Sequence, residues 1–165
     1  MRNLLEMIYE YQLLRSKEHN LSIELDDGER VRLMGLYRLL QGETIDPTSR
    51  RELMRVKLPM PVQFTMPGGF EIGEIRDLSG GGFCIATAHP PAEGTRIIVR
   101  VADPHGRSEY VFPCRVVWRA ARGPGRMGVE LDGVPHRSTF VADEDTGVWR
   151  RSLRFGDVRG EPLVA

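Results

Sequence analysis

Three arginines, at positions 50, 51 and 55, stand close enough in the chain to act on one ligand. They occur in the segment Ser49-Arg50-Arg51-Glu52-Leu53-Met54-Arg55. A planar guanidinium donates two parallel hydrogen bonds to a phosphate, or to the O6 and N7 atoms of a guanine. Charge runs of this kind are also common on solvated surfaces that bind nothing. The segment therefore indicates either a site for an anion or a guanine, or a charged surface.

A second polar segment, Asp77-Leu78-Ser79-Gly80-Gly81-Gly82, joins two expected strands. Consecutive glycines let the backbone approach a ligand closely and adopt a positive φ. Asp77 could accept hydrogen bonds from the N–H groups of a base, and Ser79 could donate and accept. In the alternative interpretation, both side chains bond to their own hairpin loop. No Gly-Lys-Ser/Thr follows, so the segment is not a P-loop.

Residues that could support catalysis or hold a metal are few and scattered. No Gly-x-Ser-x-Gly elbow surrounds Ser79, and the cysteines, Cys84 and Cys114, fall in expected strands, where packed thiols are the usual finding. The four histidines, His19, His89, His105 and His136, show no His-x-x-x-His spacing, and the two cysteines show no Cys-x-x-Cys spacing. We expect no catalytic site, no cofactor and no metal.

Proline usage separates an expected helical front from an expected β middle. No proline occurs in residues 1–46, whereas ten of the 11 prolines fall between Pro47 and Pro135. Apolar residues recur at helical spacing over residues 3–18. A second helix can begin at Asp26 or Asp27 and end at Gly42.

Each expected helix has a broad apolar face that a short helix cannot bury alone. The first face consists of Leu4, Leu5, Met7, Ile8, Tyr11 and Leu14. The second consists of Val31, Leu33, Met34, Tyr37, Leu39 and Leu40. The hairpin either completes the fold by packing on the middle segment or forms a dimer or partner-docking surface.

Short strands separated by Gly/Pro turns follow, with no helix between them. We expect strands at 56–65, 70–75, 83–86, 95–101, 110–120 and 127–131. This pattern predicts a mainly β fold, a six-stranded antiparallel barrel behind a helical hairpin. Pro59 and Pro61 should confine the first strand to an edge or a bulge. We expect Trp118 to be a core or barrel-end aromatic rather than a base-stacking platform.

Charge and composition exclude several classes of protein. The 23 basic residues, of which 21 are arginine, balance 23 acidic ones, so a strongly basic nucleic-acid binder is excluded as a description of the whole chain. Residues 47–140 carry 13 basic and nine acidic side chains, a modest excess. No apolar run approaches the roughly 18 residues that span a bilayer. Glu6 and Glu10 interrupt the N-terminal apolar stretch, so we expect no signal peptide and a cytoplasmic location.

Taken together, the two polar segments resemble the signature of the PilZ family. The matching residues are Arg51-x-x-x-Arg55 and Asp77-x-Ser79-x-x-Gly82, and Arg50 is similar to an extra arginine often found before the pair. The resemblance extends over about residues 48–135 and includes residues 75–85, Val116-Val117-Trp118 and residues 127–131.

The resemblance implies a six-stranded PilZ barrel that binds cyclic di-GMP, often as a stacked dimer of the ligand. Arg51 and Arg55 would hold phosphates and guanine Hoogsteen edges, and Arg50 would add a phosphate contact or stack on a base. Asp77 and Ser79 would bond a guanine, and Gly82 would permit the loop conformation.

The expected protein is thus a non-catalytic bacterial receptor with three parts. Residues 1–46 form a helical segment, residues 47–140 the barrel, and residues 141–165 a partly ordered tail. Ligand binding would reorder the linker at 47–55 and present the helices to a protein partner; a homodimer is compatible with this. One rival is a PilZ-like interaction module that does not bind the nucleotide. The other, a nucleic-acid binder, is disfavoured because aromatic residues do not interleave with the arginines, and membrane insertion is not expected.

Overall fold

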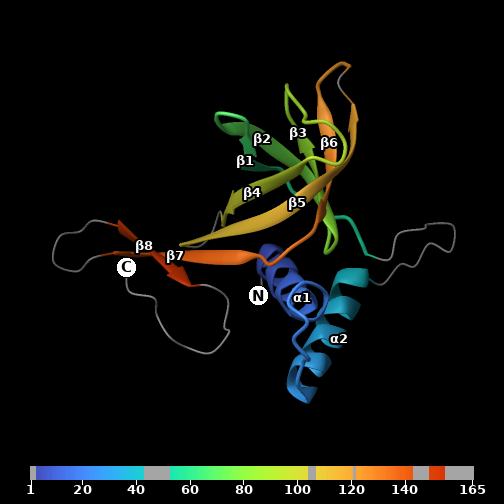
Figure 1. Ribbon diagram of the computed structural model, residues 1–165, viewed down its shortest axis with the longest axis vertical. Coiled ribbons are helices and arrows are strands. Elements are labelled where there is room, and N and C mark those ends of the chain that lie inside the picture. Colours follow the sequence, from blue (N-terminus) through green and yellow to red (C-terminus); the bar gives the residue numbers. More distant parts are fainter. Residues whose placement is uncertain (1–2, 43–52, 104–106, 121, 143–148, 155–165) are drawn as a thin grey trace, which may run out of the picture.

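The two expected helices precede the barrel. The computed structural model describes residues 3–42, 53–103, 107–120, 122–142 and 149–154, and shows helices α1 (Leu4–His19) and α2 (Asp27–Gln41) at one end of a β-barrel (Figure 1). Asp26 caps α2 through a capping box: it accepts from the N–H of Glu29, whose side chain accepts from the N–H of Asp26. Gly42, at φ 74°, ends α2. Both helix predictions are confirmed.

The apolar face predicted for α2 is only partly buried. Its buried residues are Leu36 and Leu40, whereas Val31, Met34 and Leu39 are 70%, 59% and 61% exposed. In Figure 1, α1 lies between β7 and α2, so α2 has a neighbour mainly on one side. Since only that side loses contact with water, half of the predicted apolar face stays exposed to solvent.

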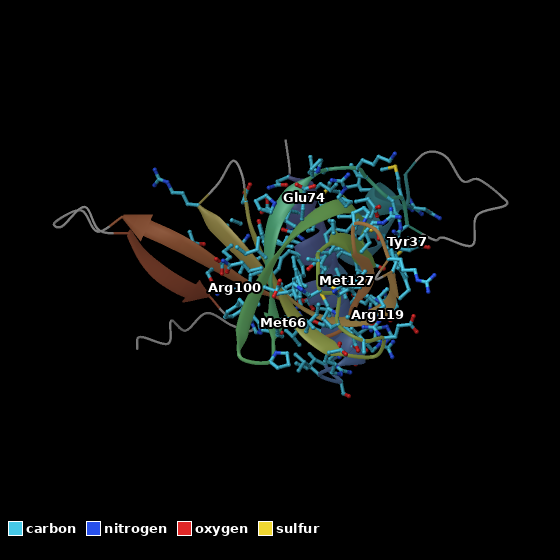
Figure 2. All side chains as sticks on the ribbon, turned by 90° about the horizontal axis from the view of Figure 1, so that it is seen from above. Tyr37, Met66, Glu74, Arg100, Arg119 and Met127 are labelled. Atoms are coloured by element: carbon cyan, nitrogen blue, oxygen red, sulfur yellow. The ribbon has the colours of Figure 1, made fainter. Side chains whose placement is uncertain are left out.

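Six antiparallel strands form the barrel, as predicted from the sequence. They are β1 (Met60–Met66), β2 (Gly69–Leu78), β3 (Gly82–Ala86), β4 (Arg96–Ala102), β5 (Ser108–Ala120) and β6 (Arg126–Leu131). The order β4-β1-β2-β3-β6-β5 closes because β4 also pairs with β5. Aromatic and aliphatic side chains fill the interior, including Phe64, Phe83, Phe112 and Met127. Figure 2 shows Met127 within the ring of strands, with Arg100 and Arg119 on opposite sides.

The first strand departs from the prediction in its start and in its neighbours. It begins at Met60, and Val56 forms only an isolated bridge to Leu78. It is not an edge strand, because β1 pairs with β2 on one side and β4 on the other. Pro61 is tolerated because the pairing with β4 begins at Val62, after the residue that lacks an N–H.

A hairpin of two further strands, β7 (His136–Ala142) and β8 (Trp149–Arg154), was not predicted as strands. β7 pairs with the start of β5, and the hairpin extends away from the barrel (Figure 1). The rest of the expected partly ordered tail, residues 143–148 and 155–165, lies outside the described residues.

The helices and the barrel share one hydrophobic core. The rings of Tyr9 and Tyr110 lie 5.4 Å apart between centroids, and the Arg137 guanidinium lies 5.4 Å from the centre of the Tyr9 ring. About one turn further along α1, the buried side chain of Gln12 donates a hydrogen bond to the carbonyl of Gly80, which follows β2. The hairpin therefore completes the fold, as one of the two interpretations expected.

Candidate functional site

Arg55 and Asp77 form an ion pair on the outside of the barrel. The backbone N–H groups of Val56 and Leu78 donate to each other's carbonyls at 2.9 and 3.0 Å, which holds the chain before β1 against the end of β2. The Arg55 Nη1 and Asp77 Oδ1 atoms are 2.9 Å apart, and the side chains are 32% and 25% exposed. Two residues predicted to share a site, 22 positions apart, therefore meet at the surface.

A β-bulge is the local reason that Asp77 faces outward. The pairing of β2 with β3 shifts register between Ile75 and Asp77. Ile75 and Leu78 are both fully buried although they are three residues apart. The bulge therefore places Arg76 and Asp77 together on the outer side, where a regular strand would turn one of them toward the core.

Ser79 bonds within its own loop. Its buried Oγ accepts from the N–H groups of Gly81 and Gly82 and lies 3.3 Å from the Gly82 carbonyl oxygen, to which it can donate. The hairpin-loop interpretation thus describes Ser79 in this structure, whereas Asp77 bonds to Arg55 instead of its own backbone.

The glycines of this loop serve close packing rather than positive φ. None of Gly80, Gly81 and Gly82 has a positive φ, so that expectation is wrong. A Cβ on Gly82 would lie 2.1 Å from the carbonyl oxygen of Val129 on β6. A Cβ on Gly80 would lie 2.7 Å from a methyl carbon of Leu53. The loop therefore needs glycine because strand and linker atoms occupy the space of a side chain.

Small residues separate Asp77 from an aromatic side chain across the outer face. Asp77 pairs with Cys84, Cys84 with Gly128, and Gly128 with Trp118. The Trp118 Nε1 atom lies 2.0 Å from where a Cβ of Gly128 would stand, so the indole covers that glycine. Trp118 is 36% exposed and lies after a second bulge. Of its two expected positions, the core is therefore excluded and the end of the barrel is left open.

Charges gather around Cys84, the small residue at the centre of this row. Burial raises the pKa of the Cys84 thiol, Asp77 adds to the rise, and Arg126, Arg55 and Arg76 oppose it. Burial also raises the pKa of the Cys114 thiol. Both cysteines are buried, so the expectation of packed thiols is confirmed. Neither is activated as a nucleophile, because a raised pKa keeps the thiol protonated.

These residues form a continuous surface that we call the outer-face patch: Arg55, Arg76, Asp77, Cys84, Trp118, Arg126 and Gly128. Arg76 also pairs with Glu74 at 2.6 Å, so three guanidinium groups face two carboxylates. The patch keeps a net positive charge and suits an anion that also has a planar face. Arg76 and Arg126 were not predicted, because only the register of β2, β3 and β6 brings them to Cys84. Arg50 and Arg51, predicted members of the site, lie outside the described residues.

Comparison with known families identifies the chain. The family model for the PilZ domain matches residues 49–141, more than half of the chain. The chain belongs to the PilZ family. A crystal structure titled as the PilZ domain of CeSA from a cellulose-synthesizing bacterium is 23% identical and covers 48% of this chain and 80% of its own, with a TM-score of 0.40. No curated protein matches the chain.

Two further properties of the described part of this PilZ protein concern membranes and metals. Neither α1 nor α2 is long and apolar enough to cross a membrane. Within the same residues, no group of three or more His, Cys, Asp or Glu side chains could hold a metal ion.

Proposed function

We propose that this PilZ protein is a non-catalytic receptor for cyclic di-GMP in the bacterial cytoplasm. The observation that supports this most strongly is the convergence of Arg55 and Asp77 on the outer-face patch. The ligand has two phosphates and two guanines. The patch offers guanidinium groups for phosphates and Hoogsteen edges, a carboxylate for guanine N–H groups, and an indole face for stacking.

In this proposal the ligand replaces the contact between Arg55 and Asp77. A partly exposed ion pair of this kind contributes only about 0–1 kcal/mol, so its opening costs little. Arg55 then turns to a phosphate or to O6 and N7 of a guanine, and Asp77 accepts from the guanine N–H groups. Arg50 and Arg51 approach from the linker and add phosphate contacts. Ser79 contacts the guanine and, with Gly82, keeps the loop in shape.

The contacts of the linker suggest how binding would reach the helices. The Met54 N–H donates to the carbonyl of Leu40 at the end of α2 over 2.9 Å. Leu53 and Leu40 both pack against Gly80, and Gln12 bonds to the Gly80 carbonyl. A ligand that draws residues 47–55 toward the patch would shift these contacts and reorient the helices for a protein partner, to the extent that it binds the closed form better.

Thermal unfolding of the full chain, measured with each of three ligands in turn, tests the proposal. We expect cyclic di-GMP to raise Tm and equimolar GTP or single-stranded DNA to leave it unchanged, because only a bound ligand stabilises the folded state. An equal shift with GTP would indicate a general anion site, and a shift with DNA the nucleic-acid binder. No shift with any ligand would favour the interaction module.

A further inference from the structure

A cleft lies between α1 and α2, outside the outer-face patch. It has a volume of about 360 Å³, at the lower end of the range of roughly 300–1,000 Å³ that small-molecule sites occupy. One face of each helix lines it, and no residue of the outer-face patch does. The lining positions are 11, 15, 18 and 19 on α1 and 33, 34, 37, 38 and 41 on α2.

Ion pairs join the two helices on a different face of each. Arg32 of α2 pairs with Glu10 of α1 at 2.7 Å, and Lys17 of α1 pairs with Glu29 of α2. At 100° per residue, these four positions lie well over a quarter turn from the centre of the lining face on their own helix. Charge therefore holds the helices together on one side and leaves the cleft on the other.

Aromatic and aliphatic side chains form the apolar part of the cleft. Tyr11 is only 6% exposed and so lies at its base, and the centroid of its ring is 6.4 Å from that of Tyr37. Leu33 is partly buried, and Met34, at 59% exposed, lies at the rim. A flexible thioether packs well on flat rings. The cleft therefore suits a planar apolar group.

The charged residues of the cleft have no ion-pair partner among the residues that the structure describes. Arg15 and Arg38 line it from opposite helices, and Glu18 and His19 line it from α1; all four are exposed. With a neutral imidazole, two guanidinium groups and one carboxylate leave one positive charge. One negative charge on a ligand balances it, and a guanidinium donates two hydrogen bonds to a carboxylate.

We propose that this cleft binds a small carboxylic acid with a planar apolar body, an aryl carboxylate. The rings and Met34 contact the body, and Arg15 and Arg38 donate to the carboxylate. An anion between the two arginines also offsets their mutual repulsion. A phosphate monoester fits less well, because its second negative charge would remain unbalanced beside Glu18. The site does not depend on the proposed binding of cyclic di-GMP.

NMR of the methionine methyl groups, recorded on the full chain during titration with 2-naphthoate, tests the proposal. The Met34 signal, assigned through Met34→Leu, reports on the cleft, and that of Met127 inside the barrel is the reference. We expect Met34 to shift saturably with a dissociation constant of about 1 mM or lower, and Met127 to stay unchanged. The neutral 2-naphthalenemethanol should bind at least about fivefold more weakly. Equal binding of the acid and the alcohol, or no shift of Met34 with the acid, overturns the proposal.

Two variants with opposite expected effects separate recognition of the anion from damage to the fold. Arg38→Gln should weaken naphthoate binding about fivefold or more and leave binding of the alcohol unchanged. Glu18→Gln should strengthen naphthoate binding, because it removes a like charge. Arg32→Gln is the control, since Arg32 is also on α2 but pairs with Glu10 outside the cleft. An unchanged affinity in Arg38→Gln, or a loss as large in Arg32→Gln, contradicts the assignment.

Discussion

The side-chain amide of Gln12 donates a buried hydrogen bond to the carbonyl oxygen of Gly80, 68 residues further along the chain. A polar residue in the core of a helix interface is thereby bonded to the loop that carries the second PilZ motif. Because Leu40 of α2 packs on the same glycine, both helices contact this loop directly. The loop and both helices are therefore in direct contact.

Gln12→Leu should lower the free energy of unfolding by about 1–3 kcal/mol, because the Gly80 carbonyl would lose its buried donor. Urea unfolding measures this change. Gln63→Leu is the control, since Gln63 is exposed on β1. Equal losses in the two variants would show that the hydrogen bond contributes nothing specific.

Gly82→Ala should destabilise the barrel by about 3 kcal/mol, because a Cβ 2.1 Å from the Val129 carbonyl forces β3 and β6 apart. Gly81→Ala provides the comparison, since the nearest atom to its Cβ would be 4.0 Å away. Urea unfolding of both variants checks the difference. If Gly82→Ala is as stable as Gly81→Ala, the close approach of β6 does not explain the glycine.

Asp77→Ala should leave the fold intact and weaken cyclic di-GMP binding by about tenfold or more. The ion pair it removes is partly exposed, so we expect a stability change of less than about 1 kcal/mol. Thermal unfolding and calorimetric titration of the same sample separate the two effects. A variant that unfolds instead would mean that Asp77 acts as a structural residue of the hairpin.

The stability of the protein should fall as the pH drops below 6.5, in part because of His136. Burial lowers the pKa of this histidine from its ordinary value of 6.5. Below that value the unfolded chain binds a proton that the folded chain does not, so protons favour unfolding until the folded pKa is also passed. His136→Gln removes this contribution, and its urea-unfolding free energy should decline less between pH 7 and pH 5 than that of the wild type. Parallel pH profiles would contradict the role of His136.

Local signals in the sequence were sufficient to predict the helices and the six barrel strands. Asp26 and Gly42 mark the ends of α2 through their capping chemistry, and alternation of apolar residues marks the strands. The hairpin of β7 and β8 was missed because arginines at 150, 151 and 154 interrupt the apolar pattern of β8. Its pairing depends on contacts with a distant strand, which a local pattern does not contain.

The site could be predicted as a pair of motifs but not as a surface. The resemblance to the two PilZ motifs identified Arg55 and Asp77, whereas the positions of Trp118 and Arg126 depend on how β5 and β6 align with β3. The bulge before Trp118 turns its side chain outward, and no residue type in the strand predicts that bulge. Exposure of Val31 and Leu39 was missed for a related reason, since periodicity identifies an apolar face but not what covers it.

Calorimetric titration of cyclic di-GMP into the wild type and Arg55→Ala tests the proposed receptor most directly. Arg100→Ala is the matched control, because Arg100 also forms an ion pair, with Glu109 at 2.7 Å, and lies on β4 away from the patch. We predict binding to the wild type, an affinity reduced by about tenfold or more in Arg55→Ala, and no change in Arg100→Ala. Equal affinities for the wild type and Arg55→Ala, or no binding to the wild type, would contradict the proposal.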